Sequence, residues 1–232
     1  MRCRIKLCGI NNFEDLELVA QEGADYGGVL VEIDSKRAVS FQQAQSLFKK
    51  PPLGLVMVTQ GQTRERNLEM AETLDPLALQ LHGEESPEHV SALNQRLDCE
   101  IWKVLHMPAK ETAEVPDTDA LVKDIQTYAE AGAKRIVIDA RVIKDGKPIS
   151  GGTGKPVDWS AAAKVIGLIQ TPIILAGGLN PDNIIAALKV VRPYAVDCSS
   201  GVEAHRAKKD PALVKAFIQR VRVATSQDDD QE

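Results

Sequence analysis

Residues 4–31 read RIKLCGINNFEDLELVAQEGADYGGVLV, in which two short β-type runs enclose a helical pattern. The runs Arg4–Cys8 and Tyr26–Val31 have the length and apolar content of strands. Asn12 is a favoured N-cap residue and Gly23 a favoured C′ residue, so a helix is predicted between them, beginning at Phe13. A strand that leads through a helix into a second strand is the unit of a parallel sheet.

The same unit recurs about eight times along the chain. Further strands are predicted at Leu53–Thr59, Ala78–Leu81, Ile101–His106, Arg135–Asp139, Ile173–Leu175 and Tyr194–Cys198. Further helices are predicted at Phe41–Phe48 after Ser40, Arg64–Leu74, Pro87–Leu97 after Ser86, Asp119–Ala131, Asp158–Leu168, Pro181–Val191 and Pro211–Val223. Eight such units in 232 residues match a closed (β/α)8 TIM barrel of the α/β class, typically about 250 residues long, better than an open doubly wound sheet.

One domain is predicted, because no linker, low-complexity block or shift in composition interrupts these units. The barrel domain is expected to take residues 1–224, and residues 225–232 to form a disordered acidic tail. The tail holds Asp228, Asp229, Asp230 and Glu232. The formal net charge of −5 therefore becomes about −1 once these four acids are set aside.

The composition, with 44% apolar and 26% charged residues, is that of an ordinary soluble protein. The densest basic run, Arg206–Lys209, is short and precedes Asp210, so we interpret it as a solvated approach to a helix and expect no nucleic-acid partner. No apolar run approaches the ~20 residues that cross a bilayer, and no signal peptide is recognised, which predicts a cytoplasmic protein without a membrane partner. The four cysteines form no C-x-x-C pair, and disulfides and a structural metal are not expected.

In such a barrel the chemistry lies on the loops that follow the C-terminal ends of the strands. Cys8 ends the first strand, and the period of two places Lys6 beside it on the inward face while Ile5 and Leu7 face outward. A lone cysteine is more often an inert core residue. Gly9, however, permits close approach at this point, and the Lys6 cation is expected to lower the pKa of the Cys8 thiol toward the range of a working base.

Asp139 closes the apolar run Ile136–Ile138, where a carboxylate must be paired, open to the mouth or functional. A capping role and a catalytic role both explain it. Together with Cys8 it supplies one group that takes a proton and one that gives a proton, which is the minimum for an isomerisation without a cofactor.

Two glycine-rich loops follow the seventh and eighth predicted strands, the usual phosphate site of barrels. The first holds Gly177 and Gly178, and the second holds Ser199, Ser200 and Gly201. A tight turn would explain either loop alone. The two together favour a phosphate dianion bound by exposed backbone N–H groups.

Three further features lie near the predicted mouth. Arg37 is either a solvated cation or the group that binds a substrate carboxylate. His82 is either a satisfied rim histidine or a substrate contact. The segment 140–156 is interpreted as a mobile loop over the mouth, and its glycines at 151–154 fail the P-loop pattern.

The chain resembles the phosphoribosylanthranilate isomerases, barrel enzymes of tryptophan biosynthesis, as far as about Phe217. The motifs that carry the resemblance occur in the family's order and are KLCGI (6–10), SKR (35–37), QLHG (80–83), GGTG (151–154), DW (158–159), AGGL (176–179) and DCSSGVE (197–203). The resemblance implies that Cys8 is the general base, that Asp139 is the general acid, that Arg37 holds the anthranilate carboxylate and that the two loops hold the phosphate. It also implies a cofactor-free Amadori rearrangement of a small phosphosugar, N-(5-phosphoribosyl)anthranilate, into 1-(2-carboxyphenylamino)-1-deoxyribulose 5-phosphate.

The chain departs from the family pattern at two places near the mouth. Residues 30–33 hold Glu32 where the family usually has an aromatic pair, and Thr59 stands where the third strand ordinarily ends in Asn. Glu32 is expected to point to solvent. Because both departures bear on the packing of the aglycone, a paralogue that acts on a related phosphoribosylamine remains an alternative.

Two other classes of protein also stay open. A noncatalytic barrel that binds a phosphosugar would need the phosphate loops and Arg37, but it would not need Cys8 and Asp139 to face each other. A metal-dependent phosphosugar epimerase would need His and Asp ligands from several strands, for which His82 and His106 alone are too few. No metal and no cofactor are therefore expected.

Overall fold

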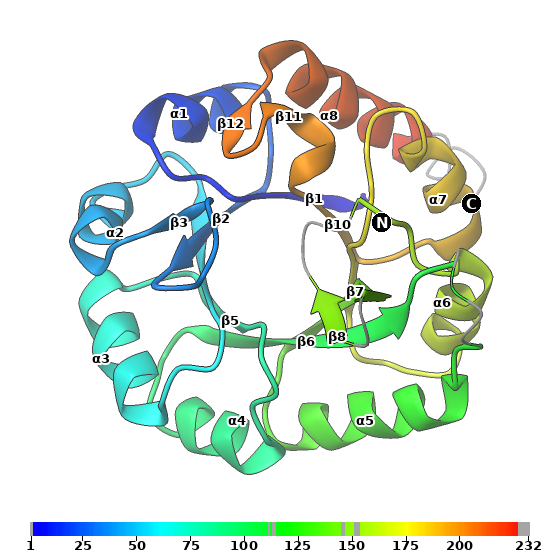
Figure 1. The fold of residues 1–232 in the computed structure, drawn as a ribbon, viewed down its shortest axis with the longest axis horizontal. Coiled ribbons are helices and arrows are strands. Elements are labelled where there is room, and N and C mark those ends of the chain that lie inside the picture. The colour runs from blue at the N-terminus through cyan, green and yellow to red at the C-terminus, as the bar shows by residue number, and fades with distance from the viewer. Residues whose placement is uncertain (1, 111, 113–114, 145–146, 151–153, 227–232) are drawn as a thin grey trace.

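The structure, a computed structural model, describes residues 2–110, 112, 115–144, 147–150 and 154–226. Within these ranges eight parallel strands close into a barrel inside a ring of eight helices (Figure 1). The strands are β1 (Arg4–Cys8), β2 (Tyr26–Val31), β4 (Gly54–Thr59), β5 (Ala78–Leu81), β6 (Glu100–Pro108), β7 (Arg135–Lys144), β9 (Ile173–Leu175) and β10 (Ala195–Cys198). The barrel closes because β1 pairs with β2 on one side and with β10 on the other.

The helices are α1 (Phe13–Gln21), α2 (Phe41–Phe48), α3 (Arg64–Leu74), α4 (Pro87–Asn94), α5 (Thr118–Glu130), α6 (Trp159–Ile166), α7 (Ile184–Val191) and α8 (Pro211–Ser226). The predicted TIM barrel is confirmed. Asn12 and Ser86 are N-caps as expected, and Ser40 forms a full capping box with Gln43. Helix α8 runs through Ser226, and residues 227–232 of the predicted tail lie outside the described residues.

Three helices are shorter than the sequence predicts. Helix α6 spans Trp159–Ile166 rather than Asp158–Leu168, because Asp158 is its N-cap and Gly167 its C-cap. Helix α4 ends at Asn94 rather than Leu97, because the N–H of Arg96 turns back onto the carbonyl of Leu93 in a tight turn. Helix α7 begins at Ile184 rather than Pro181. The side-chain oxygen of Asn180 accepts the N–H groups of residues 182 and 183 and holds them in a separate turn.

Much of the segment 140–156, interpreted from the sequence as a mobile loop over the mouth, is a β-hairpin in the described residues. Strand β7 continues to Lys144 and pairs antiparallel with β8 (Lys147–Ser150). The sequence signal for this hairpin is Asp145-Gly146, a typical two-residue hairpin turn. Residues 145–146 and 151–153 lie outside the described residues. The first three positions of the GGTG motif (151–154) are therefore not described.

The apolar side chains form two layers, as the alternation in β1 predicts. Ile5 and Leu7 belong to the larger cluster between the barrel and the helices. Cys8 belongs to the smaller cluster inside the barrel, together with Trp102 of β6. Lys6 also faces inward and is fully buried. Inward-facing positions therefore carry the polar groups, and these can reach the mouth.

Aromatic and charged side chains fill the N-terminal end of the barrel. The hydroxyls of Tyr26 and Tyr194 lie 3.0 Å apart, and Arg135 donates to Tyr194 at 3.1 Å. The Arg135 guanidinium also stacks over Trp102, 5.3 Å from the ring centre, and pairs with Glu100. This packing closes the lower end and leaves the C-terminal end for a ligand.

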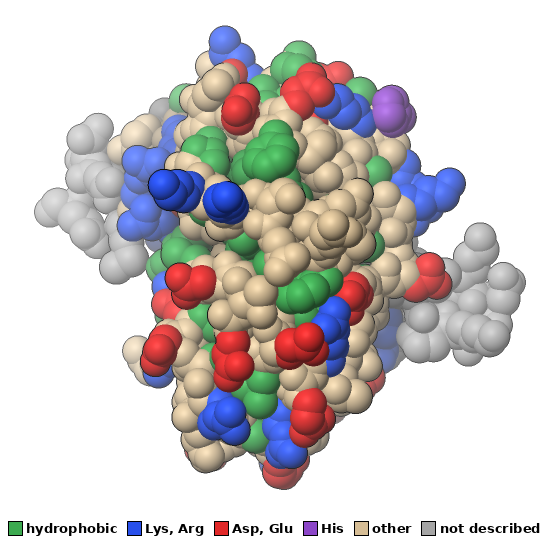
Figure 2. Space-filling view, turned by 90° about the vertical axis from the view of Figure 1, so that its left-hand side faces the viewer, with side chains coloured by type: hydrophobic (Ala, Val, Ile, Leu, Met, Phe, Trp, Pro, Cys, Tyr) green, Lys and Arg blue, Asp and Glu red, His purple; other side chains and the backbone are tan. Residues whose placement is uncertain are grey.

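Four short elements lie outside the barrel order: β3 (Ala38–Val39), the 3-10 turn η1 (Ser200–Val202), and the hairpin of β11 (Glu203–His205) with β12 (Lys208–Lys209). Figure 1 shows the β11–β12 hairpin close to α1 and α8. Figure 2, which faces the side of α2 and α3, shows acidic and basic side chains interspersed with small apolar areas. Of the described helices, none has the length and apolar content that a membrane crossing requires.

Candidate functional site

A cavity of about 300 Å³ opens at the C-terminal ends of the strands. Eight of the nine predicted site residues line it: Cys8, Arg37, His82, Asp139, Gly177, Gly178, Ser199 and Ser200. Gly201 does not line the cavity. It packs against the carbonyl of Leu179, and its N–H faces the Cys198 sulfur.

Cys8 lies at the end of β1 with 9% of its surface exposed to the cavity. Gly28 on the neighbouring strand β2 provides the room for the thiol, since a Cβ there would lie 2.7 Å from the sulfur. Burial raises the pKa of the Cys8 thiol, and the cations Lys6 and Lys209 lower it by less. Lys6 lowers this pKa in the predicted direction, but burial outweighs the effect and the pKa of Cys8 stays above its ordinary value.

Lys6 also has a partner of its own. Its Nζ lies 2.7 Å from Oδ2 of Asp197 on β10, in a buried ion pair. The negative charge of this carboxylate adds to the effect of burial and raises the pKa of Cys8 further. The other oxygen, Oδ1, is buried without a hydrogen-bond partner, and Asp197 lines the cavity. This oxygen is available to a hydroxyl of a bound ligand.

Asp139 is buried on β7, on the cavity wall. Its Oδ1 accepts the N–H of Ala140 at 2.8 Å, and its Oδ2 lies 3.5 Å from Nε2 of His82. Burial would raise the pKa of Asp139, but the neighbouring His82 and the Ala140 N–H outweigh it and hold the pKa below its usual range. Asp139 caps no helix among the described residues, because its carboxylate contacts the N–H of Ala140 and the ring of His82.

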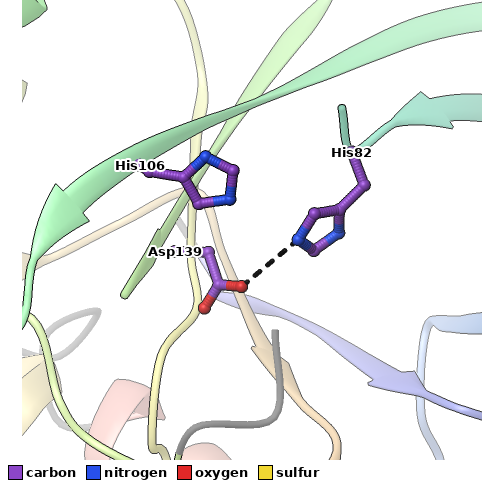
Figure 3. A group of neighbouring side chains, drawn as sticks. All are labelled: His82, His106 and Asp139. Atoms are coloured by element: carbon purple, nitrogen blue, oxygen red, sulfur yellow. Dashed lines mark ion pairs between the residues drawn. The ribbon is translucent and has the colours of Figure 1, made fainter. Parts of the chain in front are cut away.

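A second histidine completes this corner of the site. The register of β6 and β7 places His106 opposite Asp139, so both side chains project from the same face of the barrel wall. The rings of His106 and His82 lie 5.5 Å apart between centroids (Figure 3). Burial and the neighbouring His82 lower the pKa of His106 to about 4, so its ring is neutral at pH 7. Sequence reasoning noted His106 only as a residue too isolated to bind a metal.

Arg37 forms a bidentate ion pair with Glu203 of β11, its Nε and Nη2 atoms lying 2.7 and 2.8 Å from the two carboxylate oxygens. This pair raises the pKa of Arg37 and lowers that of Glu203, burial notwithstanding. One edge of the guanidinium is thereby fixed. The Nη1–Nη2 edge stays available for a second carboxylate.

The basic run Arg206–Lys209 is not a solvated approach to a helix, as the sequence suggested. It forms the β11–β12 hairpin, and Lys209 is buried there with its Nζ 2.6 Å from the carbonyl of Cys8 and 3.0 Å from that of Ser199. Lys209 therefore joins the end of β1 to the second phosphate loop. Arg206 lines the cavity from the same hairpin. Contacts between residues about 200 positions apart, such as Lys209 with Cys8, leave no local signal.

The departures at residues 30–33 affect the cavity wall. Leu30 and Ile33 line it and supply an apolar surface. Glu32 is exposed and pairs with Arg66 of α3 at 2.6 Å, so the prediction that it points away from the mouth is confirmed. Thr59 is fully buried and does not line the cavity.

Comparison with known proteins gives one consistent family. The family model for N-(5'-phosphoribosyl)anthranilate (PRA) isomerase matches residues 5–220. N-(5'-phosphoribosyl)anthranilate isomerase 1 of Methanosarcina mazei is 34% identical over 97% of this chain and 97% of its own. The crystal structure of the phosphoribosylanthranilate isomerase of Thermotoga maritima, in a monomeric form, superposes with a TM-score of 0.78 at 32% identity, covering 95% of this chain and 99% of that one.

A further solved structure of a phosphoribosylanthranilate isomerase contains reduced 1-(o-carboxyphenylamino)-1-deoxyribulose 5-phosphate. It superposes with a TM-score of 0.76 at 29% identity and covers 95% of this chain and 99% of that one.

Proposed function

Because the chain belongs to the N-(5'-phosphoribosyl)anthranilate isomerase family of tryptophan biosynthesis, we propose that Cys8 and Asp139 are the base and the acid of its reaction. The protein is an isomerase and catalyses the Amadori rearrangement of N-(5-phosphoribosyl)anthranilate to 1-(2-carboxyphenylamino)-1-deoxyribulose 5-phosphate. The rearrangement moves protons within one molecule. A positioned acid and a positioned base therefore suffice for it.

In the first step Asp139 gives its proton to the oxygen of the ribose ring. The bond between this oxygen and C1 breaks, the oxygen becomes a hydroxyl, and the anthranilate nitrogen and C1 form an iminium. Asp139 must be protonated for this step, whereas its lowered pKa makes it a carboxylate at neutral pH. His82, 3.5 Å away, is the neighbour that can supply the proton.

In the second step the Cys8 thiolate takes the proton from C2, and the electron pair of the C–H bond neutralises the iminium. The resulting enolamine tautomerises to the aminoketone. Asp197 supports this step through its unpartnered Oδ1, which can accept a hydrogen bond from a ribose hydroxyl. Correct placement of C2 against the sulfur also contributes to the rate, since holding two reacting groups in a near-attack geometry lowers the barrier.

Binding groups surround these two residues. Gly177, Gly178, Ser199 and Ser200 offer backbone and hydroxyl donors to the phosphate, and Gly201 shapes the loop from behind. Arg37, held by Glu203, faces the anthranilate carboxylate with its free edge. Leu30 and Ile33 pack against the anthranilate ring.

The observation that carries this proposal is that Cys8 and Asp139 line one small cavity together with both phosphate loops. Cys8→Ser should remove most turnover, because an alcohol is a far weaker acid than a thiol and yields no base near neutral pH. Asp139→Asn should do the same, because an amide cannot give the proton. Turnover is followed by the loss of anthranilate fluorescence, with Cys99→Ser outside the cavity as the matched control.

Activity within a few-fold of the parent in either variant, with the fold intact by circular dichroism, would reject that residue's role. Inorganic phosphate should inhibit competitively, and noncompetitive inhibition would move the phosphate away from the glycine loops.

We also propose that residues 1–224 act as a single domain, which is supported by the family match over residues 5–220 and by barrel closure between β1 and β10. A small phosphosugar is its proposed ligand. The cytoplasm is the proposed compartment, since its reducing conditions keep thiols such as Cys8 reduced.

A further inference from the structure

The ends of three neighbouring strands bring two imidazoles and a carboxylate to one point. His82 follows β5, His106 lies in β6 and Asp139 lies in β7, and one ligand atom from each lies within 4.8 Å of the other two. Figure 3 shows both rings and the carboxylate directed toward the space between them. The proposed reaction uses Asp139 and His82 and leaves His106 without a task.

Both histidines have an unused ring nitrogen in this space. Nε2 of His82 and Nε2 of His106 are buried atoms that have no hydrogen-bond partner among the described residues. The 3.5 Å from His82 Nε2 to Asp139 Oδ2 is an ion-pair distance and is too long for a good hydrogen bond. Buried polar atoms are almost always satisfied, and these two ring nitrogens beside the Asp139 carboxylate are therefore available to a ligand.

We propose that His82, His106 and Asp139 form a binding site for a divalent first-row transition-metal ion, with Zn²⁺ as its typical occupant. Two imidazole nitrogens and one carboxylate oxygen are a ligand set that Zn²⁺ and its neighbours in the series accept, whereas Mg²⁺ and Ca²⁺ require oxygen ligands. Three protein ligands leave at least one coordination position open. This position faces the cavity, because His82 and Asp139 line it.

The surroundings fit a cation. Ala140 donates its N–H to Oδ1 of Asp139 and thereby fixes the carboxylate with Oδ2 turned toward the histidines. Lys103 acts electrostatically on His106, but it is engaged by Glu85 at 3.2 Å and by the carbonyl of Gly83 at 2.6 Å. The exposed acid Glu84 acts on His106 with the opposite sign. The charge balance at the site therefore does not oppose a bound Zn²⁺.

A bound ion would switch the isomerase off, and this consequence rests on the proposed role of Asp139. An ion on Oδ2 prevents the carboxylate from taking up and giving the proton that opens the ring. It also takes the lone pair of His82, the neighbour that resupplies the proton. Free transition-metal ions in the compartment would therefore inhibit the isomerase by binding at this site.

Metal binding is tested first, independently of activity. The full chain is titrated with Zn²⁺ by calorimetry and with Co²⁺ by visible absorption, comparing the parent, His106→Gln and His205→Gln. His205 is exposed on β11 and is the matched control. We expect one ion per chain, loss of more than about 10-fold in affinity for His106→Gln, and no change for His205→Gln.

Equal binding by the parent and His106→Gln would overturn the site. So would thiolate charge-transfer absorption in the Co²⁺ spectrum, which would place the ion on a cysteine. His82→Gln, a change at the half-exposed rim, serves as a second variant for metal binding alone if His106→Gln does not fold.

Activity is tested second. Zn²⁺ should inhibit the parent, a chelator should restore it, and His106→Gln should keep its basal turnover while requiring more than about 10-fold more Zn²⁺ for inhibition. Binding that depends on His106 without any inhibition would keep the metal site and reject the role of Asp139 as the acid. Inhibition that is equal in both proteins would reject the switch.

Discussion

At the residue scale, the Cys8 thiol and the Asp139 carboxyl are each held in the ionisation state opposite to the one that the reaction needs. Burial keeps the sulfur protonated, and His82 with the Ala140 N–H keeps the carboxyl ionised. The active form, thiolate with carboxylic acid, carries the same number of protons as this dominant form. The population of the active form is therefore small, and it does not change with pH between the pKa values of Asp139 and Cys8.

This pairing predicts the pH dependence of kcat/KM. The value of kcat/KM should be constant across neutral pH. It should fall at alkaline pH, because Cys8 then loses its proton and the pair no longer carries the one proton that the active form needs. This fall should occur at a pKa above that of an ordinary thiol. Residual activity of Asp139→Asn should instead rise through that pKa, because only the thiolate is then required. Rates measured over the alkaline range check both limbs, and parallel profiles for the two proteins would contradict the assignment.

Gly28 offers a second test, because its missing side chain is what leaves room for the Cys8 sulfur. Gly28→Ala should lower kcat by more than about 10-fold, since a displacement near 1 Å of a reacting group is that costly, and should change KM little. Gly167→Ala, where a Cβ meets nothing nearer than 3.6 Å, is the control. Unchanged kcat with an intact fold would show that the sulfur position is not critical.

Arg37 and Glu32 are two charged residues near the mouth whose replacement should affect kcat/KM very differently. Arg37→Ala should cost about 2 to 4 kcal/mol in kcat/KM, because it removes a charge-assisted carboxylate contact in a partly dry site. Glu32→Gln should cost under about 0.5 kcal/mol, because its exposed pair with Arg66 is weak. The same variants are then measured on a phosphoribosylaniline that lacks the carboxylate. An equal loss of kcat/KM for Arg37→Ala on this second substrate would mean that Arg37 does not bind the anthranilate carboxylate.

At the scale of elements, Asp25 joins the start of β1 to helix α8. Its carboxylate accepts hydrogen bonds from Arg222 at 2.7 Å and from the N–H of Ile5 at 2.8 Å. Although burial opposes it, these donors lower the pKa of Asp25. The group thus stabilises the fold above its unfolded pKa of about 3.9, and this contribution is lost as the pH falls through the lower folded pKa.

Asp25→Asn should therefore lower the free energy of unfolding by about 1.5 to 3 kcal/mol at pH 7, the range for hydrogen bonds to a charged group. The difference from the parent should shrink at acidic pH, and kcat should not change. Urea unfolding at several pH values measures this effect. Asp182→Asn, whose pair with Arg220 is largely exposed, should cost under about 1 kcal/mol.

At the scale of the whole molecule, the sequence predicted the barrel well because its signals are local. Strand bounds follow from apolar runs such as Ile173–Leu175, and helix starts follow from caps such as Ser40, each decided within a few residues. Eight of the nine predicted site residues meet in one cavity because the strand ends of a barrel converge.

What the sequence did not predict depends on contacts between distant segments. Asp197 lies 191 positions from Lys6, pairs with it and opposes its lowering of the Cys8 pKa. The sequence around Lys209 predicts an exposed side chain. Lys209 is instead buried, because its Nζ donates to the carbonyls of Cys8 and Ser199. His106 becomes part of the site only through the register of β6 against β7.

The acidic tail gives a prediction from sequence alone. Gln227–Glu232 holds no apolar side chain to bury, so its removal should alter neither thermal stability nor kcat/KM. Melting and turnover of the shortened chain are compared with those of the parent. A fall in either would reveal a contact that the composition does not indicate.

The pairing of β1 with β10 also governs how the protein is made. Lys6 is translated 191 residues before Asp197, and until β10 is made the ammonium has no counter-charge and its burial is costly. A nascent chain that lacks β10 therefore has an open seam beside the strand that carries Cys8. On the proposed role of Cys8, we expect a chain that has not yet made β10 to be inactive.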